Sequence, residues 1–303
     1  MKITTIHKLK MPYQYKIKGL NWLLNRVVLF IENYLIRSSN LKNCIEPGIN
    51  KVPVIVSLTT YPGRTKKIQW TLKSLFNQTA KVDRIILWLA KEQYLQGEIP
   101  KEIKKYEKYG LEVKFCNDLK SHKKYYYSML QNPNAIVITV DDDVIYPEDT
   151  IEKLLSTHER FPKAVVCNMG RWISCSGKIF ESYKKWSVNI PQEITKPTFR
   201  ILPIGEGGVL YPPHSIDKEC FNVNGIKKNA FTADDLWLKY AEVRCGTKAM
   251  ITKSNQKGMC QVLVKGEKNI GLNSMNVTHG MNDQVIAKLN KKYPKVYEII
   301  KRQ

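Results

Sequence analysis

The chain lacks three features that would each have assigned it to a functional class. Its seven cysteines are scattered, odd in number and contain no Cys-x-x-Cys pair, which excludes the usual zinc and dithiol motifs. No Gly-Lys-Ser or Gly-Lys-Thr follows a glycine-rich stretch, which excludes a Walker phosphate loop. No segment is apolar enough to predict a membrane span. We therefore expect a cytoplasmic protein with reduced thiols.

Acidic residues are also scarce, with 27 Asp and Glu against 49 Lys and Arg and a net charge of +22. An excess of this size favours an anionic partner: a nucleic acid, an anionic membrane surface or a phosphorylated substrate. The alternative is a composition biased toward Lys, Asn and Ile throughout the genome. Charge alone does not decide among these explanations.

Residues 1–50 form a basic, amphipathic segment that differs from the rest of the chain. After a Lys-rich lead, the apolar residues of 19–36 recur at helical spacing and are expected to leave Arg26 and Asn33 toward another face. Such a helix suits the plane of an anionic membrane, so we expect peripheral association at the inner face of the cell membrane. The alternative is a helix packed on the domain that follows.

From residue 51 to 303, short β-branched runs alternate with helical patterns, which is typical of an α/β domain. We expect a Rossmann-like mixed sheet flanked by helices, with loops over 171–213. The expected strands are 52–58, 84–89, 112–115 and 135–140, and the expected helices are 68–77, 100–109, 122–131, 233–243 and a basic terminal helix 282–302.

The sharpest motif is VDDDVIYPED at 140–149, in which three aspartates follow an apolar strand. Adjacent carboxylates repel one another, and a bound cation relieves that repulsion. Oxygen ligands favour Mg²⁺ or Mn²⁺, which commonly bridge protein carboxylates to substrate phosphates. The carboxyl ends of strands are also where α/β sheets bind ligands. The alternative is a solvated acidic turn before a helix.

Four segments, taken in order, resemble bacterial glycosyltransferases of the family 2 type. They are VPVIVSLTTYPGR (52–64), DDD (141–143), GEGGVLYPP (205–213) and TADDLWL (232–238). The resemblance implies a GT-A fold with an Asp-x-Asp metal motif, a nucleotide-sugar donor, and Mn²⁺ or Mg²⁺ as cofactor. It also implies a catalytic domain over 51–303, with a nucleotide half at about 51–150 and an acceptor half at about 151–285.

The resemblance implies a donor and metal site around the first strand and the aspartate motif. In the family, the first carboxylate of the motif lies near the ribose or donor sugar and the last binds the metal. These positions map to Asp141 and Asp143. A late histidine, His279, is a further candidate metal ligand; the alternative is that His279 has a structural role. The donor-binding candidates are Thr59, Thr60, Tyr61, Arg64, Lys123, Lys124, Asp141 and Asp142, and the metal candidates are Asp143, Asp141 and His279.

The glycine-rich loop and the ADD sequence are the candidates for the acceptor side. By resemblance, Glu206, Gly207 and Gly208 lie beside the donor sugar and acceptor, unless they form a plain turn. Asp235 aligns with the catalytic base of inverting enzymes, and Asp234 would orient the acceptor or cap the helix. A helix start favours ionised carboxylates. A swap of the two roles, or simple capping by both, remains open.

The predicted function is a metal-dependent, inverting sugar transfer from a nucleotide-sugar donor, with a UDP-sugar favoured. The acceptor is a glycan or lipid-linked saccharide in bacterial surface polysaccharide synthesis, such as capsule or O-antigen. A nucleotidyltransferase is the alternative enzyme, but its glycine-rich basic loop after the first strand is represented here only by Gly63 and Arg64. A nucleic-acid-binding protein fits the charge but not the acidic clusters, so no nucleic-acid partner is expected.

Overall fold

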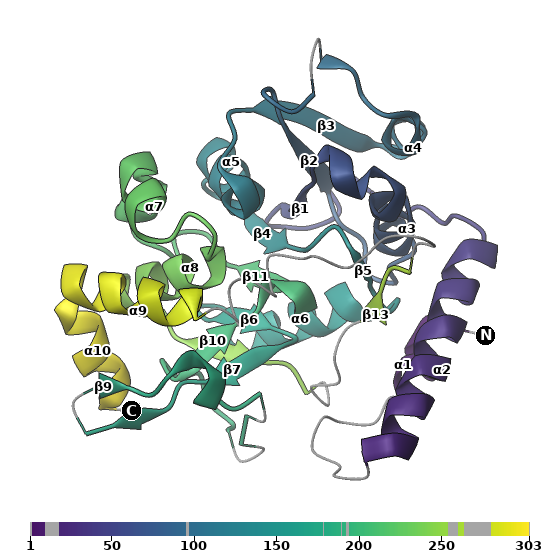
Figure 1. Ribbon diagram of the computed structural model, residues 1–303. Coiled ribbons are helices and arrows are strands. Elements are labelled where there is room, and N and C mark those ends of the chain that lie inside the picture. Colours follow the sequence, from purple (N-terminus) through teal and green to yellow (C-terminus); the bar gives the residue numbers. More distant parts are fainter. Residues whose placement is uncertain are drawn as a thin grey trace.

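The computed structural model describes residues 2–9, 18–94, 97–177, 179–188, 190–191, 194–253, 260–263 and 280–302. Its centre is a seven-stranded mixed sheet flanked by helices (Figure 1), as predicted. The strands, in spatial order, are β12 (Ala249–Ile251), β6 (Val165–Cys167), β11 (Val209–Tyr211), β4 (Ile136–Thr139), β1 (Val54–Thr59), β2 (Arg84–Ala90) and β3 (Leu111–Cys116).

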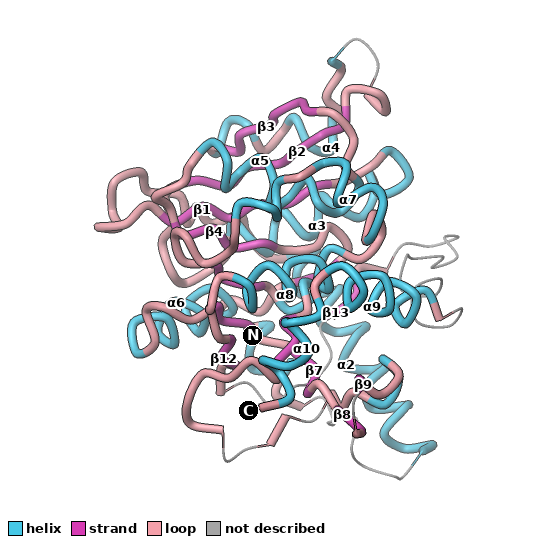
Figure 2. Tube along the Cα trace, turned by 90° about the vertical axis from the view of Figure 1, so that its left-hand side faces the viewer, coloured by secondary structure: helices cyan, strands magenta, loops and turns pink. Residues whose placement is uncertain are grey.

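Strand direction within this sheet decides where functional side chains meet. β1 pairs in parallel with β2 and β4, and β2 pairs in parallel with β3. β11 runs antiparallel between β4 and β6, whereas β12 is parallel to β6. Figure 2 shows β1 to β4 side by side in the upper half of the molecule. Because β1 and β4 are parallel neighbours, the segments that follow them leave the same edge of the sheet.

Hydrophobic side chains cover both faces of the sheet, because successive residues of a strand point to opposite faces. In β6, Val166 packs into the core under α3, whereas Val165 and Cys167 pack into the core that includes α8. Among the described residues, six α-helices lie between β1 and β12 in the sequence. They are α3 (Thr65–Phe76), α4 (Lys101–Lys104), α5 (Lys123–Gln131), α6 (Thr150–Arg160), α7 (Val223–Asn229) and α8 (Asp234–Arg244).

Short strands also occur in and around the region that was expected to consist of loops. They have two or three residues each, which is too short for a period-2 pattern to be recognised in the sequence. They are β5 (Val144–Ile145) paired with β13 (Cys260–Gln261), β7 (Gly170–Trp172) paired with β10 (Ile201–Pro203), and β8 (Cys175–Ser176) paired with β9 (Ile179–Phe180).

The C-terminal region contains two helices, α9 (Met281–Lys292) and α10 (Pro294–Lys301), so the single helix predicted over 282–302 is wrong. Pro294 has no backbone N–H to donate, and its ring disfavours helical geometry in the residue before it. Tyr293 accordingly has φ −130° and ψ 64°, outside the helical region. The proline therefore ends α9 and begins α10.

The N-terminal segment packs on the domain, as one of the two alternatives stated. It contains α1 (Ile3–His7) and the long α2 (Lys18–Ser38), which lies along the side of the domain (Figure 1). Val28 and Ile36 are buried, but so is Asn33, whose amide bonds two backbone groups. Asn33 thus lies on another face than Leu23, Val27, Phe30 and Tyr34, and that face is the one turned to the domain. None of the helices in the described ranges is long and apolar enough to cross a membrane.

Candidate active site

The aspartate motif leaves β4 at the edge of the sheet where ligands bind in α/β folds, and a buried tyrosine ties it to the glycine-rich loop. The amide of Asp141 donates to the hydroxyl of Tyr146 at 2.9 Å. The same hydroxyl donates to the carbonyl oxygen of Glu206 at 3.1 Å. Tyr146 is 0% exposed. Sequence reasoning did not single out Tyr146, although a tyrosine within the acidic motif was the available signal.

The loop after β1 contacts the last two aspartates, as the parallel pairing of β1 and β4 requires. Thr60 Oγ1 donates to Asp142 Oδ2 at 2.5 Å. Arg64 places Nη1 2.5 Å from Asp142 Oδ1 and 3.1 Å from Asp143 Oδ2. Burial disfavours the charged guanidinium, but Asp142 and Asp143 outweigh burial and raise the pKa of Arg64. Arg64 is therefore a fixed cation of the site, not a surface charge.

Asp143 is the carboxylate of the motif that the protein compensates least. Burial raises its pKa to about 6, and neighbouring Asp142 and Asp141 add to the increase, although Arg64 opposes it. Lys67, which sequence reasoning missed, also lowers the pKa of Asp143 through its charge. An additional cation near Asp143 would therefore stabilise its ionised form.

Lys124 is the second fixed cation, and it lies between the two acidic motifs. Its Nζ is 2.7 Å from Asp141 Oδ1 and 3.0 Å from Asp234 Oδ2. The side chain is 4% exposed, so water screens these pairs little. Ser57 of β1 donates to the carbonyl oxygen of Lys124 at 2.5 Å and fixes α5 against the sheet. Lys124, a predicted donor-binding residue, thus contacts aspartates of both acidic motifs.

The ADD sequence lies where α8 begins, with Asp234 and Asp235 in its first turn. The N-cap is Ala233, which has no side-chain acceptor, and Asp235 Oδ1 instead accepts from the amide of Gly205 at 3.1 Å. Asp234 is buried, yet Lys124 and His122 outweigh burial and lower its pKa.

The electrostatic environment of Asp235 is the reverse of the one expected from its place at a helix start. Burial raises its pKa well above the usual range, and Asp234 and Asp141 add to the increase. Lys124 and the amide of Gly205 act in the opposite direction without overcoming it. Burial, together with the two neighbouring carboxylates, therefore outweighs the groups that favour an ionised Asp235. A carboxylate with a raised pKa is a stronger base once it is ionised.

Three other candidates of the donor side have contacts of different kinds. Thr59 Oγ1 donates to the carbonyl oxygen of Trp88 at 2.8 Å. Tyr61 is 44% exposed, and the guanidinium of Arg64 lies 5.6 Å from its ring centroid. Lys123 pairs with Asp118 at 2.5 Å. Of these side chains, Tyr61 is the one most open to a ligand from solvent.

The remaining candidates belong to the glycine-rich loop and the metal site. A Cβ at Gly207 would lie 2.7 Å from Cβ of Met169, so this glycine permits close packing. Gly208 has φ +84°, which glycine adopts without strain. His279 lies outside the described residues. Within the described ranges, no three His, Cys, Asp or Glu side chains are arranged to hold a metal ion.

Charges at this edge of the sheet do not balance. The aspartates form two contiguous groups, 141–143 and 234–235. In the described part of the chain, the cations that act on them are Arg64, Lys124 and Lys67, together with His122, whose own pKa burial lowers. Excess negative charge in a poorly solvated site is costly unless a cation binds. The candidate active site, defined by these aspartates and cations, is therefore suited to a ligand that brings positive charge.

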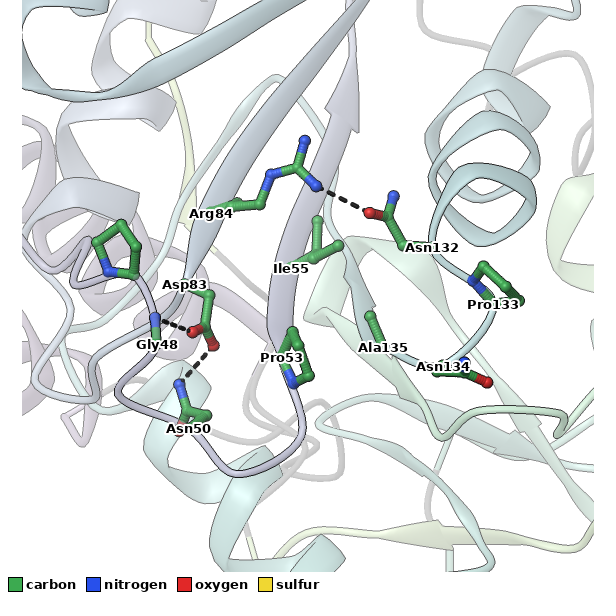
Figure 3. A pocket seen from close by; sticks show the side chains of 11 residues that line it. Gly48, Asn50, Pro53, Ile55, Asp83, Arg84, Asn132, Pro133, Asn134 and Ala135 are labelled. Carbon is green, nitrogen blue, oxygen red and sulfur yellow. Dashed lines mark hydrogen bonds between the residues drawn. The ribbon is translucent and has the colours of Figure 1, made fainter.

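A separate cavity of about 470 Å³ lies where β1, β2 and β4 begin (Figure 3). Pro53 precedes β1, Arg84 is the first residue of β2, and Ala135 precedes β4. The side chain of Asp83 points to the amide of Gly48 and accepts from it at 2.7 Å. This cavity is at the opposite end of the strands from the aspartates. Its charged groups are paired with protein partners, so we place the candidate active site at the carboxyl ends.

Comparison with known proteins gives likenesses among solved structures and none among family models or curated sequences. Among solved structures, it is similar to the mannosyltransferase PcManGT from Pyrobaculum calidifontis, which was solved in complex with GDP-Man and Mn²⁺. The two share 12% sequence identity over 88% of this chain and 80% of that chain, with a TM-score of 0.46. At these values the activity must be argued from the residues of the site.

Proposed function

We propose that this protein is a glycosyltransferase that moves a sugar from a nucleotide-sugar donor to a hydroxyl group of a glycan or lipid-linked acceptor. One observation supports it most: two acidic groups, 141–143 and 234–235, meet around the buried Lys124 where the strands end. The first group suits a metal-bound diphosphate, and the second suits the activation of an acceptor hydroxyl. A UDP-sugar is the favoured donor, by resemblance.

The donor set fits a hard divalent cation, Mn²⁺ or Mg²⁺, bound by Asp143 and Asp141. Mg²⁺ commonly takes one or two protein carboxylates and completes its shell with water and substrate phosphates. The absence of a three-ligand protein cluster among the described residues agrees with that mode of binding. The metal, when bound, supplies positive charge that stabilises the leaving diphosphate. His279 remains a candidate third ligand.

The chain's own residues would perform the rest of the transfer. Asp235 accepts the proton of the acceptor hydroxyl, whose oxygen then bonds to the anomeric carbon. The bond from that carbon to the diphosphate oxygen breaks, and the nucleoside diphosphate leaves. Attack from the face opposite the leaving group inverts the anomeric configuration. Arg64 and Lys124 supply fixed positive charge beside the phosphates, and Tyr61 offers an exposed ring to the nucleotide.

We place the reaction in bacterial surface polysaccharide assembly at the inner face of the cell membrane, on the basis of the family resemblance. The acidic site argues against a nucleic-acid partner, because clustered carboxylates repel phosphate unless a metal intervenes. A nucleotidyltransferase would be expected to have a glycine-rich loop with several backbone amides directly after β1. The loop here contains Gly63 and continues into α3 without such a run.

The deciding experiment is a thermal-shift and turnover screen with UDP-, GDP-, CMP- and dTDP-sugars, with and without Mn²⁺. We expect one nucleotide class to stabilise the protein only when metal is present. Asp143→Ala should abolish that metal-dependent shift and lower turnover, because the diphosphate charge is then uncompensated.

The matched control is Glu159→Ala, which removes an exposed carboxylate from the end of α6. It should keep both the thermal shift and the turnover. Full turnover in EDTA would overturn the metal requirement. Transfer of a nucleotidyl group in place of a sugar would overturn the reaction class.

A further inference from the structure

Helix α2 has an apolar stripe on the side that faces away from the domain. The exposed fractions are 53% for Leu23, 47% for Val27, 67% for Phe30 and 63% for Tyr34. Positions three or four apart share one face of a helix, so these four side chains form a continuous row over three turns. We call this row the α2 stripe. Large apolar groups gathered on one exposed face favour an interaction site over chance exposure.

The opposite face of α2 is held on the domain by polar contacts that fix its rotation. The buried carboxylate of Glu32 lies 2.7 Å from Nδ1 of His7 in α1. Asn33 Oδ1 accepts from the amide of Leu263 at 2.9 Å. Glu148, which follows the aspartate motif, accepts from the first amides of α1. Turning the stripe inward would break these bonds, so the fold presents it to solvent.

Basic and aromatic groups flank the α2 stripe. Arg26 lies three residues after Leu23, and Arg37 lies three residues after Tyr34, so both belong to the exposed side of the helix. The guanidinium of Arg37 lies 4.8 Å from the ring centroid of Trp70, and Nζ of Lys73 lies 5.9 Å from it. An apolar row with cations on the same side of the helix is the pattern of helices that bind in the plane of a membrane interface.

We infer that the α2 stripe docks on an anionic lipid bilayer, with α2 parallel to the membrane surface. The apolar side chains enter the boundary between headgroups and acyl chains, and the flanking cations contact lipid phosphates. The charge of the chain favours this occupant over a second copy. Each copy has a net charge of +22, so two copies joined through α2 would bring like charges together. This inference rests on the membrane location in the proposed function and names the surface responsible for it, whereas vesicle binding is measured without any sugar transfer.

The test is cosedimentation of the full-length protein with vesicles of phosphatidylglycerol and phosphatidylcholine, compared with vesicles of phosphatidylcholine alone. We expect strong binding to the anionic vesicles that weakens as salt is added. The double variant Phe30→Ser/Tyr34→Ser should bind at least 10-fold more weakly, because it removes the two most exposed side chains of the α2 stripe. These residues lie outside the candidate active site, so transfer to a water-soluble acceptor should not change.

The matched control is Leu130→Ser/Ile299→Ser, which removes two exposed apolar side chains from α5 and α10. It should bind vesicles like the wild type. Equal binding by the stripe variant and the wild type would overturn the inference. So would a dimer in sedimentation equilibrium that the stripe variant abolishes, because the stripe would then serve self-association. Far-UV circular dichroism of both variants checks that α2 is retained.

Discussion

Lys124 and Asp141 form an ion pair with 2.7 Å between Nζ and Oδ1, in which the lysine side chain is buried and the aspartate is 33% exposed. The same ammonium group lies 3.0 Å from Oδ2 of Asp234, so one cation joins the end of β4 to the start of α8. The α5 and α8 elements that meet here come from the two halves predicted for the domain. Lys124 is therefore placed to hold the donor and acceptor sides of the candidate active site at a fixed separation.

Lys124→Met keeps the length of the side chain but removes its charge. The buried Asp234 and the 33% exposed Asp141 then lose their shared partner. Breaking a buried pair typically costs about 3–5 kcal/mol of stability, and solvation of Asp141 reduces that cost. We expect a lowered free energy of unfolding in urea and lost activity. Lys123→Met is the control, because Lys123 is equally buried but pairs with Asp118, five residues before it in the sequence, and does not join β4 to α8. An equal loss in both variants would contradict a bridging role for Lys124.

Addition of Asp234→Asn to Lys124→Met offers a second check. The double variant lacks one of the carboxylates that the first substitution leaves unpaired. It should therefore recover part of the lost stability, and the double-mutant cycle should show coupling between the two positions. Additive losses would mean that the 3.0 Å contact contributes little.

Much of the central sheet could be predicted from the sequence because its strands are long and apolar. Val54–Thr59 and Arg84–Ala90 are β-branched runs bounded by polar turns, and both were predicted within two residues at each end. β6, β11 and β12 have three residues each and gain their strand character from neighbours distant in the sequence. Periodicity cannot reveal such strands.

The acidic groups of the candidate active site could be predicted from the sequence, but the contacts that join its segments could not. The aspartates stood out because adjacent like charges are unusual beside an apolar strand. Tyr146 did not, because a tyrosine four residues before a helix is ordinary until the structure shows its hydroxyl bonded to two loops. The raised pKa of Asp235 likewise depends on Asp141, which only the fold brings near.

Gly205→Ala should lower activity more than it lowers stability. A Cβ at this position would lie 2.8 Å from Nζ of Lys124 and 3.1 Å from Oδ1 of Asp235. Lys124 is held by two ion pairs, so the methyl group would displace the ammonium or the carboxylate of Asp235. We expect at least a 10-fold loss of kcat with a thermal midpoint near that of the wild type. A variant with normal kcat would show that this loop tolerates movement.

Glu148→Gln should loosen α1. Burial of Glu148 favours the neutral carboxyl, but the amides of Thr4 and Ile3 outweigh it and lower its pKa below the ordinary 4.5. The ionised form therefore stabilises the docked helix above pH 4.5, and that contribution is lost as pH falls through the lowered pKa. Amide exchange at Ile3 and Thr4, corrected for intrinsic rates, should be faster in the variant at pH 7.

The difference in exchange between Glu148→Gln and the wild type should shrink as the pH is lowered below 4.5. Glu159→Gln, at an exposed position of α6, should leave the exchange of both amides unchanged. Unaltered protection in Glu148→Gln at neutral pH would show that apolar packing alone holds α1.

Asp235→Asn tests the assignment of the catalytic base. An amide cannot accept the acceptor's proton, and loss of a general base typically lowers the rate by about 10²- to 10⁴-fold. Donor and metal affinity should stay near wild type, because the contacts of Asp235 are to Gly205 and not to the loop after β1. NMR of the wild-type product should show an inverted anomeric configuration. Near-normal turnover in Asp235→Asn, or a retained configuration, would remove Asp235 from this role.

The pH dependence of kcat/KM in Asp234→Asn distinguishes the roles of Asp234 and Asp235. Asp235 acts as a base only when ionised, so kcat/KM should fall as pH drops below its raised pKa. The charge of Asp234 contributes to that increase, after burial. Removing the charge lowers the pKa of Asp235, and the acidic limb of the pH profile should move to lower pH while the rate at high pH falls less than in Asp235→Asn. If Asp234 is itself the base, Asp234→Asn instead suffers the larger loss at every pH.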